Sequence, residues 1–248
     1  MAKKLKKKIQ LFYTILLFLL IGNIISSVNA IDYGIGVHQD QEIIWKCNVC
    51  NQMEMDLIFG SNWKDSDIFK NLSIGKRMKW KINNVEINQS ISKISFSIWH
   101  WTSEEIWGTK DNDSEIMYTF DSMVTNFTMY KSLVPLWFPI PVGEFMGNLV
   151  LNEWYDVDNR VLPTLNVEIE SNAISLGFPL KKIKIIAIYN DQGILNSYKL
   201  YTTGNIVIID ISLDFLPIYV VPTLIGLIFG LSISLGLFIY KKRRSISK

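Results

Sequence analysis

Two cysteines, Cys47 and Cys50, lie in a C-x-x-C spacing within the stretch EIIWKCNVC. Such a pair can form a disulfide, contribute half of a zinc site or act as a redox couple. A tetrahedral zinc site needs four ligands, and apart from carboxylates the chain adds only His38 and His100. A thioredoxin-like couple is expected at the start of a helix in a βαβ pattern, which the flanking sequence lacks. The compartment decides between these possibilities, because thiols tend to pair outside the cytoplasm.

Residues 1–30 have the order of a secretory signal peptide. Five lysines precede an apolar run from Leu11 to Ile25, and the small-residue site Val28-Asn29-Ala30 follows. A helix of this run would be roughly 23 Å long, shorter than the hydrocarbon core of about 30 Å. We therefore predict a signal peptide that is cleaved after Ala30, with an uncleaved anchor as the alternative.

Residues 215–240 are uncharged and predominantly apolar, and the basic cluster KKRR follows directly. As a helix they would extend about 39 Å, enough to cross a bilayer with some tilt. Basic clusters stay on the cytoplasmic side. We therefore predict a single-pass protein of the cell membrane, with an extracytoplasmic domain at residues 31–214, a transmembrane helix at 215–240 and a cytoplasmic tail at 241–248.

Within the predicted span, small residues recur every four positions at Gly226, Gly230 and Ser234. Such a stripe lets two helices approach closely. It predicts a homodimer or a partner helix in the membrane. The function that would follow is that of an accessory subunit of a membrane complex.

The charges are divided unevenly along the chain. Ten of the 25 basic residues lie in residues 1–30 and 241–248, whereas all 23 acidic residues lie in residues 31–214. The predicted exported domain is therefore acidic. Since phosphate contacts need a basic face, we do not expect a nucleic-acid partner.

The exported domain is predicted to be mainly β (α+β). Residues 181–189, 194–201 and 205–213 are β-rich runs joined by short turn signals, which favours an antiparallel meander. Short helices are expected near residues 65–72 and 143–154. The fold class is thus an antiparallel, strongly curved sheet with one or two short helices and one C-terminal transmembrane helix. Alternation also predicts earlier strands at residues 42–47, 77–82, 93–101 and 166–170.

In the predicted exported compartment, an internal disulfide is the first interpretation of the cysteine pair. Residues three apart on an extended strand are separated by roughly 10 Å, whereas a disulfide needs Cα atoms within about 7 Å. We therefore expect the strand that begins at Glu42 to end near Lys46, followed by a turn.

The stretch SLVPLWFPIPVG, residues 132–143, contains three prolines among large apolar residues, so a regular element is not expected there. It could fill the core, line a groove or face the membrane, and we predict the first because large apolar side chains are usually buried. Its Trp137 and Phe138 nevertheless count as candidate binding residues.

Residues 99–115 combine tryptophans with carboxylates, a composition that can bind sugars or calcium. The candidate binding residues here are Trp99, Trp101 and Trp107, but the interpretation we favour is a strand end followed by a solvated acidic hairpin loop. Glu104 and Glu105 are a poor catalytic pair, because adjacent residues on a strand point to opposite faces. No catalytic residue, metal site or cofactor is predicted, since the chain lacks the common enzyme motifs.

The chain contains N-x-S/T sequons, and their clustering suits a glycosylated outward face. They begin at Asn71, Asn88, Asn112 and Asn126.

Two resemblances accompany these patterns. The layout of signal peptide, β-rich domain and basic-stopped C-terminal helix resembles that of uncharacterised archaeal membrane-anchored surface proteins. The stretch YNDQGILNSYKLY, residues 189–201, resembles the Y-D-x-x-G-x-L hairpin of some envelope proteins of the lipoprotein-carrier type, with Asn190 and Asp191 at the aspartate position. That resemblance implies a sheet wrapped around an apolar cavity, with residues 132–143 as its lid or plug.

Together these observations predict a non-enzymatic surface or envelope protein whose β-rich domain binds a ligand or partner outside the cell. A tethered carrier or sensor of a lipid or other apolar ligand is the first alternative. An exported glycan-processing enzyme and an accessory membrane subunit are the others.

Overall fold

The computed structural model describes residues 32–65, 67–103, 106–120, 127–170, 181–214 and 231–232. From Gly34 onward the described residues belong to one compact unit. In them, nine strands form one antiparallel sheet in the order β4-β3-β2-β1-β9-β8-β7-β6-β5. The strands are β1 (Glu42–Cys50), β2 (Arg77–Ile87), β3 (Ile91–Thr102), β4 (Asn112–Thr119), β5 (Tyr155–Asp158), β6 (Thr164–Ile169), β7 (Ile183–Tyr189), β8 (Leu195–Thr202) and β9 (Ile206–Leu213).

β1 and β9, the first and last strands along the chain, pair with each other at the centre of the sheet. Trp45 of β1 lies opposite Leu213 of β9, and the remaining strands extend outward on both sides as meanders. The predicted meander of the last three strands is confirmed as β7, β8 and β9. The two halves of the sheet are therefore joined by a pairing between residues near opposite ends of the domain.

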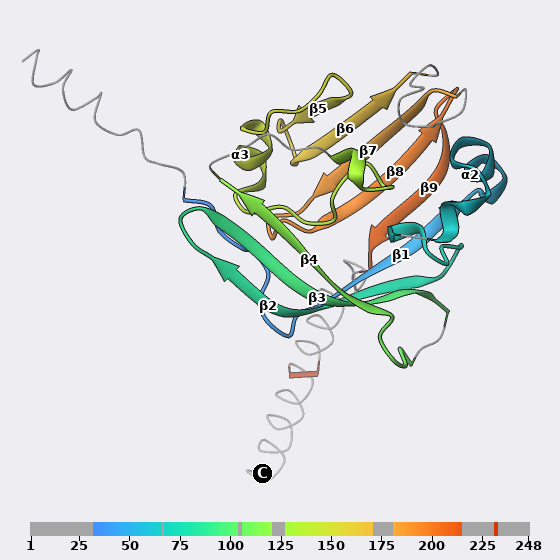
Figure 1. The fold of residues 1–248 in the computed structure, drawn as a ribbon. Helices are drawn as coiled ribbons and strands as arrows, with labels where there is room; N and C mark the ends of the chain where they lie inside the picture. The colour runs from blue at the N-terminus through green and yellow to red at the C-terminus, as the bar shows by residue number, and fades with distance from the viewer. Residues whose placement is uncertain are drawn as a thin grey trace, which may run out of the picture. The chain divides into compact units, whose positions relative to one another are not determined.

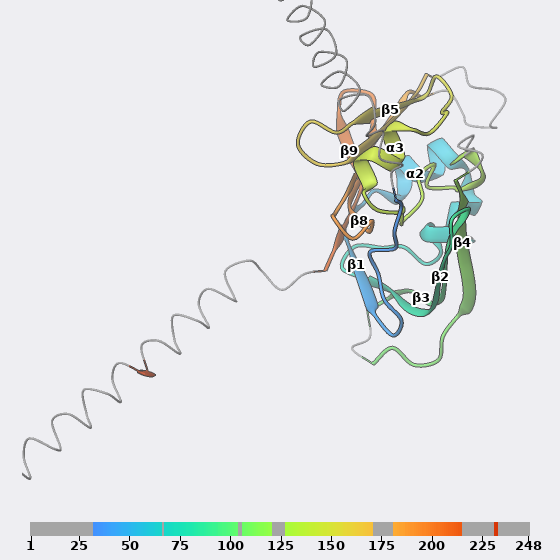
Figure 2. The same ribbon diagram turned by 90° about the vertical axis from the view of Figure 1, so that its left-hand side faces the viewer.

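The sheet bends so that its two halves face each other (Figures 1 and 2). Short helices accompany it at α2 (Gln52–Phe59), η1 (Ser61–Asp65), η2 (Asp67–Phe69), η3 (Phe127–Met129) and α3 (Val142–Gly147). Residues 132–143, which we call the plug, run between the two halves of the sheet. Rings from both halves meet there, because Phe138 contacts Tyr118 of β4 and Tyr189 of β7. The predicted role of this segment in the core is thereby confirmed.

The backbone of the plug is irregular and buried, so its polar groups need partners other than a strand ladder. Tyrosine hydroxyls supply several of them. Tyr118 donates to the carbonyl of Trp137 at 2.9 Å, and Tyr189 donates to that of Pro135 at 2.7 Å. Tyr198 on β8 likewise donates to Ser132 at 3.3 Å. These hydroxyls allow an apolar, proline-containing segment to fill the interior.

The turn between β7 and β8 also supports the plug. Gly193 has a φ of 83°, and its carbonyl accepts a hydrogen bond from the Phe138 N–H at 2.8 Å. A Cβ at this position would lie 2.0 Å from the Phe138 carbonyl oxygen. Both the positive φ and this close approach require glycine, which explains the glycine of the NDQG turn.

Several expected boundaries differ from the observed ones. The strand expected to end near Lys46 continues to Cys50. The acidic loop expected after the strand at 93–101 contains β4. The helix expected at 65–72 is a pair of short 3-10 turns, and the one expected at 143–154 shortens to α3, because its later residues turn back toward β5.

The predicted signal peptide lies outside the described residues. In the described part of the chain, no helix is both long and apolar enough to cross a bilayer. The predicted span also lies outside that part, apart from Leu231 and Ser232. Gly226, Gly230 and Ser234 are therefore outside it, and the span remains a prediction from the sequence.

Candidate functional site

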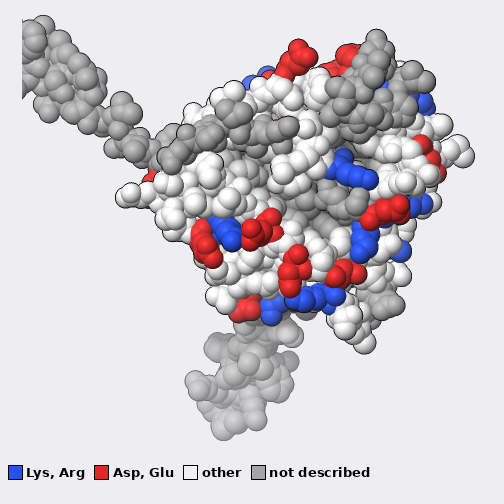
Figure 3. Space-filling view, in the orientation of Figure 1, with Lys and Arg blue, Asp and Glu red and all other residues white. Residues whose placement is uncertain are grey.

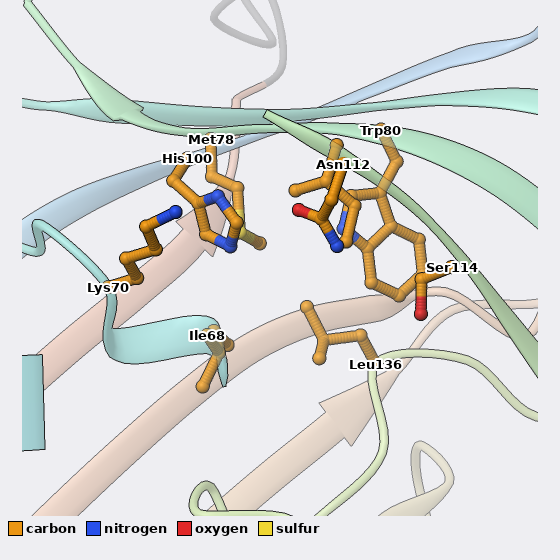
Figure 4. Close-up of a pocket in the computed structure, with 9 residues that line it drawn as sticks. Ile68, Lys70, Met78, Trp80, His100, Asn112, Ser114 and Leu136 are labelled. Atoms are coloured by element: carbon orange, nitrogen blue, oxygen red, sulfur yellow. The ribbon is translucent and has the colours of Figure 1, made fainter. Parts of the chain in front are cut away.

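A cavity of about 310 Å³ opens on the concave face of the sheet, between β2, β3, β4, the segment around η2 and the plug. Its wall mixes apolar and polar side chains, and none of the described residues that line it is a carboxylate. Figure 4 shows Ile68 and Leu136 facing the sheet across this space. The lining residues are Ile68, Lys70, Met78, Trp80, Ile98, His100, Asn112, Ser114 and Leu136.

Strand alternation brings most of the wall to one face. Met78 and Trp80 point inward from β2, and the indole of Trp80 stacks on Phe96 of β3 with ring centroids 3.8 Å apart. The pairing of β2 with β3 shifts between Arg77 and Lys79, as a β-bulge does. Near this shift, consecutive residues of β3, His100 and Trp101, are both buried.

Trp101 then fixes the opposite wall. Its indole N–H donates to the carbonyl of Ile68, which holds η2 over the sheet. Ile68 is itself 3 % exposed and lines the cavity. Trp101 is thus a structural residue of this site and does not reach the open space.

Polar groups gather at one side of the cavity. The Nδ1 of His100 lies 3.2 Å from a carboxylate oxygen of Asp111, which also accepts the His100 backbone N–H at 2.7 Å. Partial burial would raise the pKa of Asp111, but these hydrogen bonds and the nearby Lys70 lower it below its usual value. Lys70 is half-buried and points toward His100 (Figure 4). Its ammonium forms no hydrogen bond or ion pair with any residue that the structure describes.

Trp99 and Trp107 face a different partner. The ammonium of Lys79 lies over both rings, 4.4 Å from the centroid of Trp99 and 5.1 Å from that of Trp107. It also pairs with Glu42 at 3.0 Å. The lysine of the chain itself therefore occupies the aromatic pair that the sequence suggested for sugars, and Glu104 and Glu105 lie outside the described residues.

Trp137 and Phe138, the other candidate binding residues, belong to the core. Their exposed fractions are 1 % and 0 %. Phe138 contacts the rings of Phe127 and Phe145 in addition to the tyrosines on either side. Neither side chain lines the cavity, although Leu136 of the same segment does.

A β-bulge brings Cys47 and Cys50 together. The pairing of β1 with β9 shifts between Cys47 and Val49, leaving Asn48 as the extra residue. Residues three apart normally point to opposite faces of a strand, but the extra residue turns both cysteines inward, and both are buried. Their mutual hydrogen bond, together with burial, raises the pKa of the Cys47 thiol, and the same contact lowers the pKa of Cys50.

This geometry leads to a testable expectation. Both cysteines are buried thiols in the structure, and the bulge turns them to the same face. The chain isolated from an oxidising compartment should be about 2 Da lighter than after reduction, with Cys47 and Cys50 joined. Closing a ring of this size should stabilise the fold by about 2 kcal/mol. Intact-mass spectrometry and urea unfolding with and without reductant measure both quantities. The Cys47→Ser variant should lose both differences, whereas equal masses would contradict the disulfide.

The remaining predicted sites are placed as follows. Asn71, Asn88 and Asn112 are exposed, as glycosylation requires, and Asn126 lies outside the described residues. Asn112 also lines the cavity, so a glycan there would compete with a ligand. Among the described residues, no group of three or more His, Cys, Asp or Glu side chains could hold a metal ion.

The resemblance to carrier-type envelope proteins implied an apolar cavity, but sequence reasoning did not identify the residues that line this one. The only functional role considered for His100 was that of a zinc ligand, and Lys70 and Ser114 received no role. The sequence around each of these residues gives little indication of such a role, because the cavity forms only where distant segments of the chain meet. The alternation of Met78 and Trp80 on β2 was the available signal for the face that bears the site.

Comparisons of the chain with protein-family models, curated proteins and solved structures found no match.

Proposed function

We propose that the chain is a membrane-anchored surface or envelope protein whose extracytoplasmic β-rich domain binds a small ligand. The observation that carries this proposal is the cavity of about 310 Å³ on the concave face of the sheet. Ligand sites are typically concave and mostly apolar, with a few convergent polar groups. The anchoring rests on the sequence of the two ends of the chain, and a binding role needs no catalytic group.

The size of the cavity favours a small ligand over a lipid cargo. At roughly 30 Å³ of liquid volume per water-sized group, it holds about ten non-hydrogen atoms, far fewer than a two-chain lipid contains. The rest of the concave interior is filled by the plug and by the rings around Phe138. A lipid carrier would have to expel the plug, whose carbonyls are engaged by Tyr118 and Tyr189.

A glycan-processing enzyme is less well supported. Such an enzyme needs two carboxyl groups about 5 to 9 Å apart beside its substrate. The described part of the cavity wall contributes no carboxyl group, and the nearby Asp111 is engaged by His100. Binding without catalysis is therefore the function we propose.

The proposal can be tested by closing the cavity from its edge strand. Ser114 is exposed on β4 and lines the cavity, so Ser114→Trp should fill its mouth without disturbing the core. We expect native mass spectrometry of the full chain, isolated from its own membrane, to show a small-molecule adduct that is lost from this variant.

Met117→Trp is the matched control. Met117 lies on the same strand, is 53 % exposed, and is three residues away on the opposite face. The adduct should persist in this variant. A chain without any adduct, or an adduct retained equally by both variants, would contradict the proposed binding site.

A further inference from the structure

We infer that the ligand is a small amphiphile with one anionic group, which Lys70 holds at the polar side of the cavity while the apolar body lies against Trp80 and Leu136. This inference rests on the proposed function and adds the chemical class of the ligand.

The charge of the wall carries the first step. Among the described residues that line the cavity, Lys70 alone has a charged side chain. Lysines on the strands beside the cavity are ion-paired, for example Lys93 of β3 with Glu115 at 2.9 Å. Figure 3 shows the same mixing of acidic and basic side chains over one face of the molecule. A half-buried ammonium without a described partner, directed at a cavity, suits a carboxylate or another small anion.

The neighbouring polar groups point to the same class. Ser114 has a hydroxyl that forms no hydrogen bond with any described residue, and the amide of Asn112 makes only a long contact of 3.5 Å to the Asp113 carbonyl. Both groups can donate to an anion. Figure 4 shows them across the cavity from Lys70 and His100. A polar ligand group on the side opposite Lys70 can therefore also be hydrogen-bonded.

Asp111 is an acidic group near this side of the cavity, and its contacts with His100 limit its effect on a ligand. Its carboxylate accepts the backbone N–H of His100 and lies against the imidazole ring. It does not line the cavity. A cationic ligand would meet Lys70 first, because Lys70 is in the wall and Asp111 is behind His100.

The apolar part of the wall sets the body of the ligand. Ile68, Met78, Trp80 and Leu136 line the cavity and are each at most 5 % exposed, so they form an apolar part of its wall. With room for about ten non-hydrogen atoms, an eight-carbon carboxylate has a suitable size. We therefore use octanoate as the anionic probe, with octanol and octylammonium as its neutral and cationic counterparts.

The experiment separates binding in the cavity from the head-group preference. The full chain in detergent is labelled with an eight-carbon alcohol that bears a diazirine, and labelled peptides are mapped by mass spectrometry. We expect labels on residues 68–80, 98–114 and 136. Octanoate should compete at roughly tenfold lower concentration than octanol, because a hydrogen bond to a charged group contributes about 1.4 kcal/mol or more. Octylammonium should compete least.

Variants of Lys70 then test its role. Lys70→Gln should remove the tenfold advantage of octanoate and leave competition by octanol unchanged, and Lys70→Arg should retain the advantage. Lys110→Gln is the control, since Lys110 is half-exposed and pairs with Asp113 at 2.5 Å. Micelle partitioning is common to all variants and cancels in this comparison.

The outcomes distinguish the two proposals. Labelling of the cavity with equal competition by the three head groups, or preference for octylammonium, would overturn the anionic inference alone. Labelling that avoids the cavity would overturn the proposed function as well. An octanoate advantage that survives in Lys70→Gln would remove Lys70 from the site.

Discussion

Replacing Phe138 with alanine should lower the free energy of unfolding by about 3–5 kcal/mol. The ring is 0 % exposed and lies at the centre of the aromatic cluster of the plug. Its centroid is 4.8 Å from that of Tyr189 and 5.6 Å from those of Tyr118 and Phe127. Truncation leaves a cavity among rigid rings held on different strands, which cannot collapse together. Urea unfolding of the full chain in detergent measures the loss.

Met129→Ala provides the control for this prediction. Met129 is a large apolar residue on the neighbouring η3, but it is 78 % exposed. Its truncation should change stability by less than about 0.5 kcal/mol. A Phe138→Ala chain as stable as the Met129→Ala chain would mean that the plug does not hold the two halves of the sheet together.

The central strands could be predicted from the sequence because each carries a long alternation or apolar run. In β7, alternate residues from Ile183 to Tyr189 are buried, a pattern that is visible in the letters alone. The edge strands lack such runs. In β4 only Ile116 and Tyr118 are buried, and its first half, Asn112 to Glu115, is polar because it borders the mouth of the cavity.

Helix α2 was missed although its end signals are present. Asn51 caps the helix by accepting a hydrogen bond from the Glu54 N–H at 3.2 Å, and Gly60 follows its last turn. Asn three residues before Glu, with a glycine after the apolar residues, is a helix-start and helix-stop pattern.

The candidate site was hidden for a different reason. Its wall is assembled from five separate parts of the chain, and shifts in register decide which residues of a strand face inward. A bulge turns Cys50 to the same face as Cys47, and another shift in register precedes the buried His100. A register shift depends on the partner strand, so the residues of one strand do not reveal it.

Above pH 10, the free energy of unfolding should fall steeply. Each buried tyrosine should contribute a fixed slope to this fall. Burial raises the pKa of Tyr118 and of Tyr189 well above the usual value of a phenol. Their contribution is therefore complete below the unfolded pKa near 10. As the pH rises further, the unfolded chain releases protons that the folded chain retains. Each tyrosine should then remove about 1.4 kcal/mol of stability per pH unit.

Tyr189→Phe isolates this contribution from that of lysines that titrate in the same range. At pH 7 the variant should be about 1–2 kcal/mol less stable, because the buried Pro135 carbonyl loses the hydroxyl that donates to it at 2.7 Å. Its stability should then fall by about 1.4 kcal/mol less per pH unit above pH 10, so that the two curves meet near pH 11. Urea unfolding at a series of pH values, with tyrosinate absorbance followed in parallel, measures both slopes. Parallel curves would show that Tyr189 ionises within the folded protein, and hence that the plug opens to solvent without unfolding of the sheet.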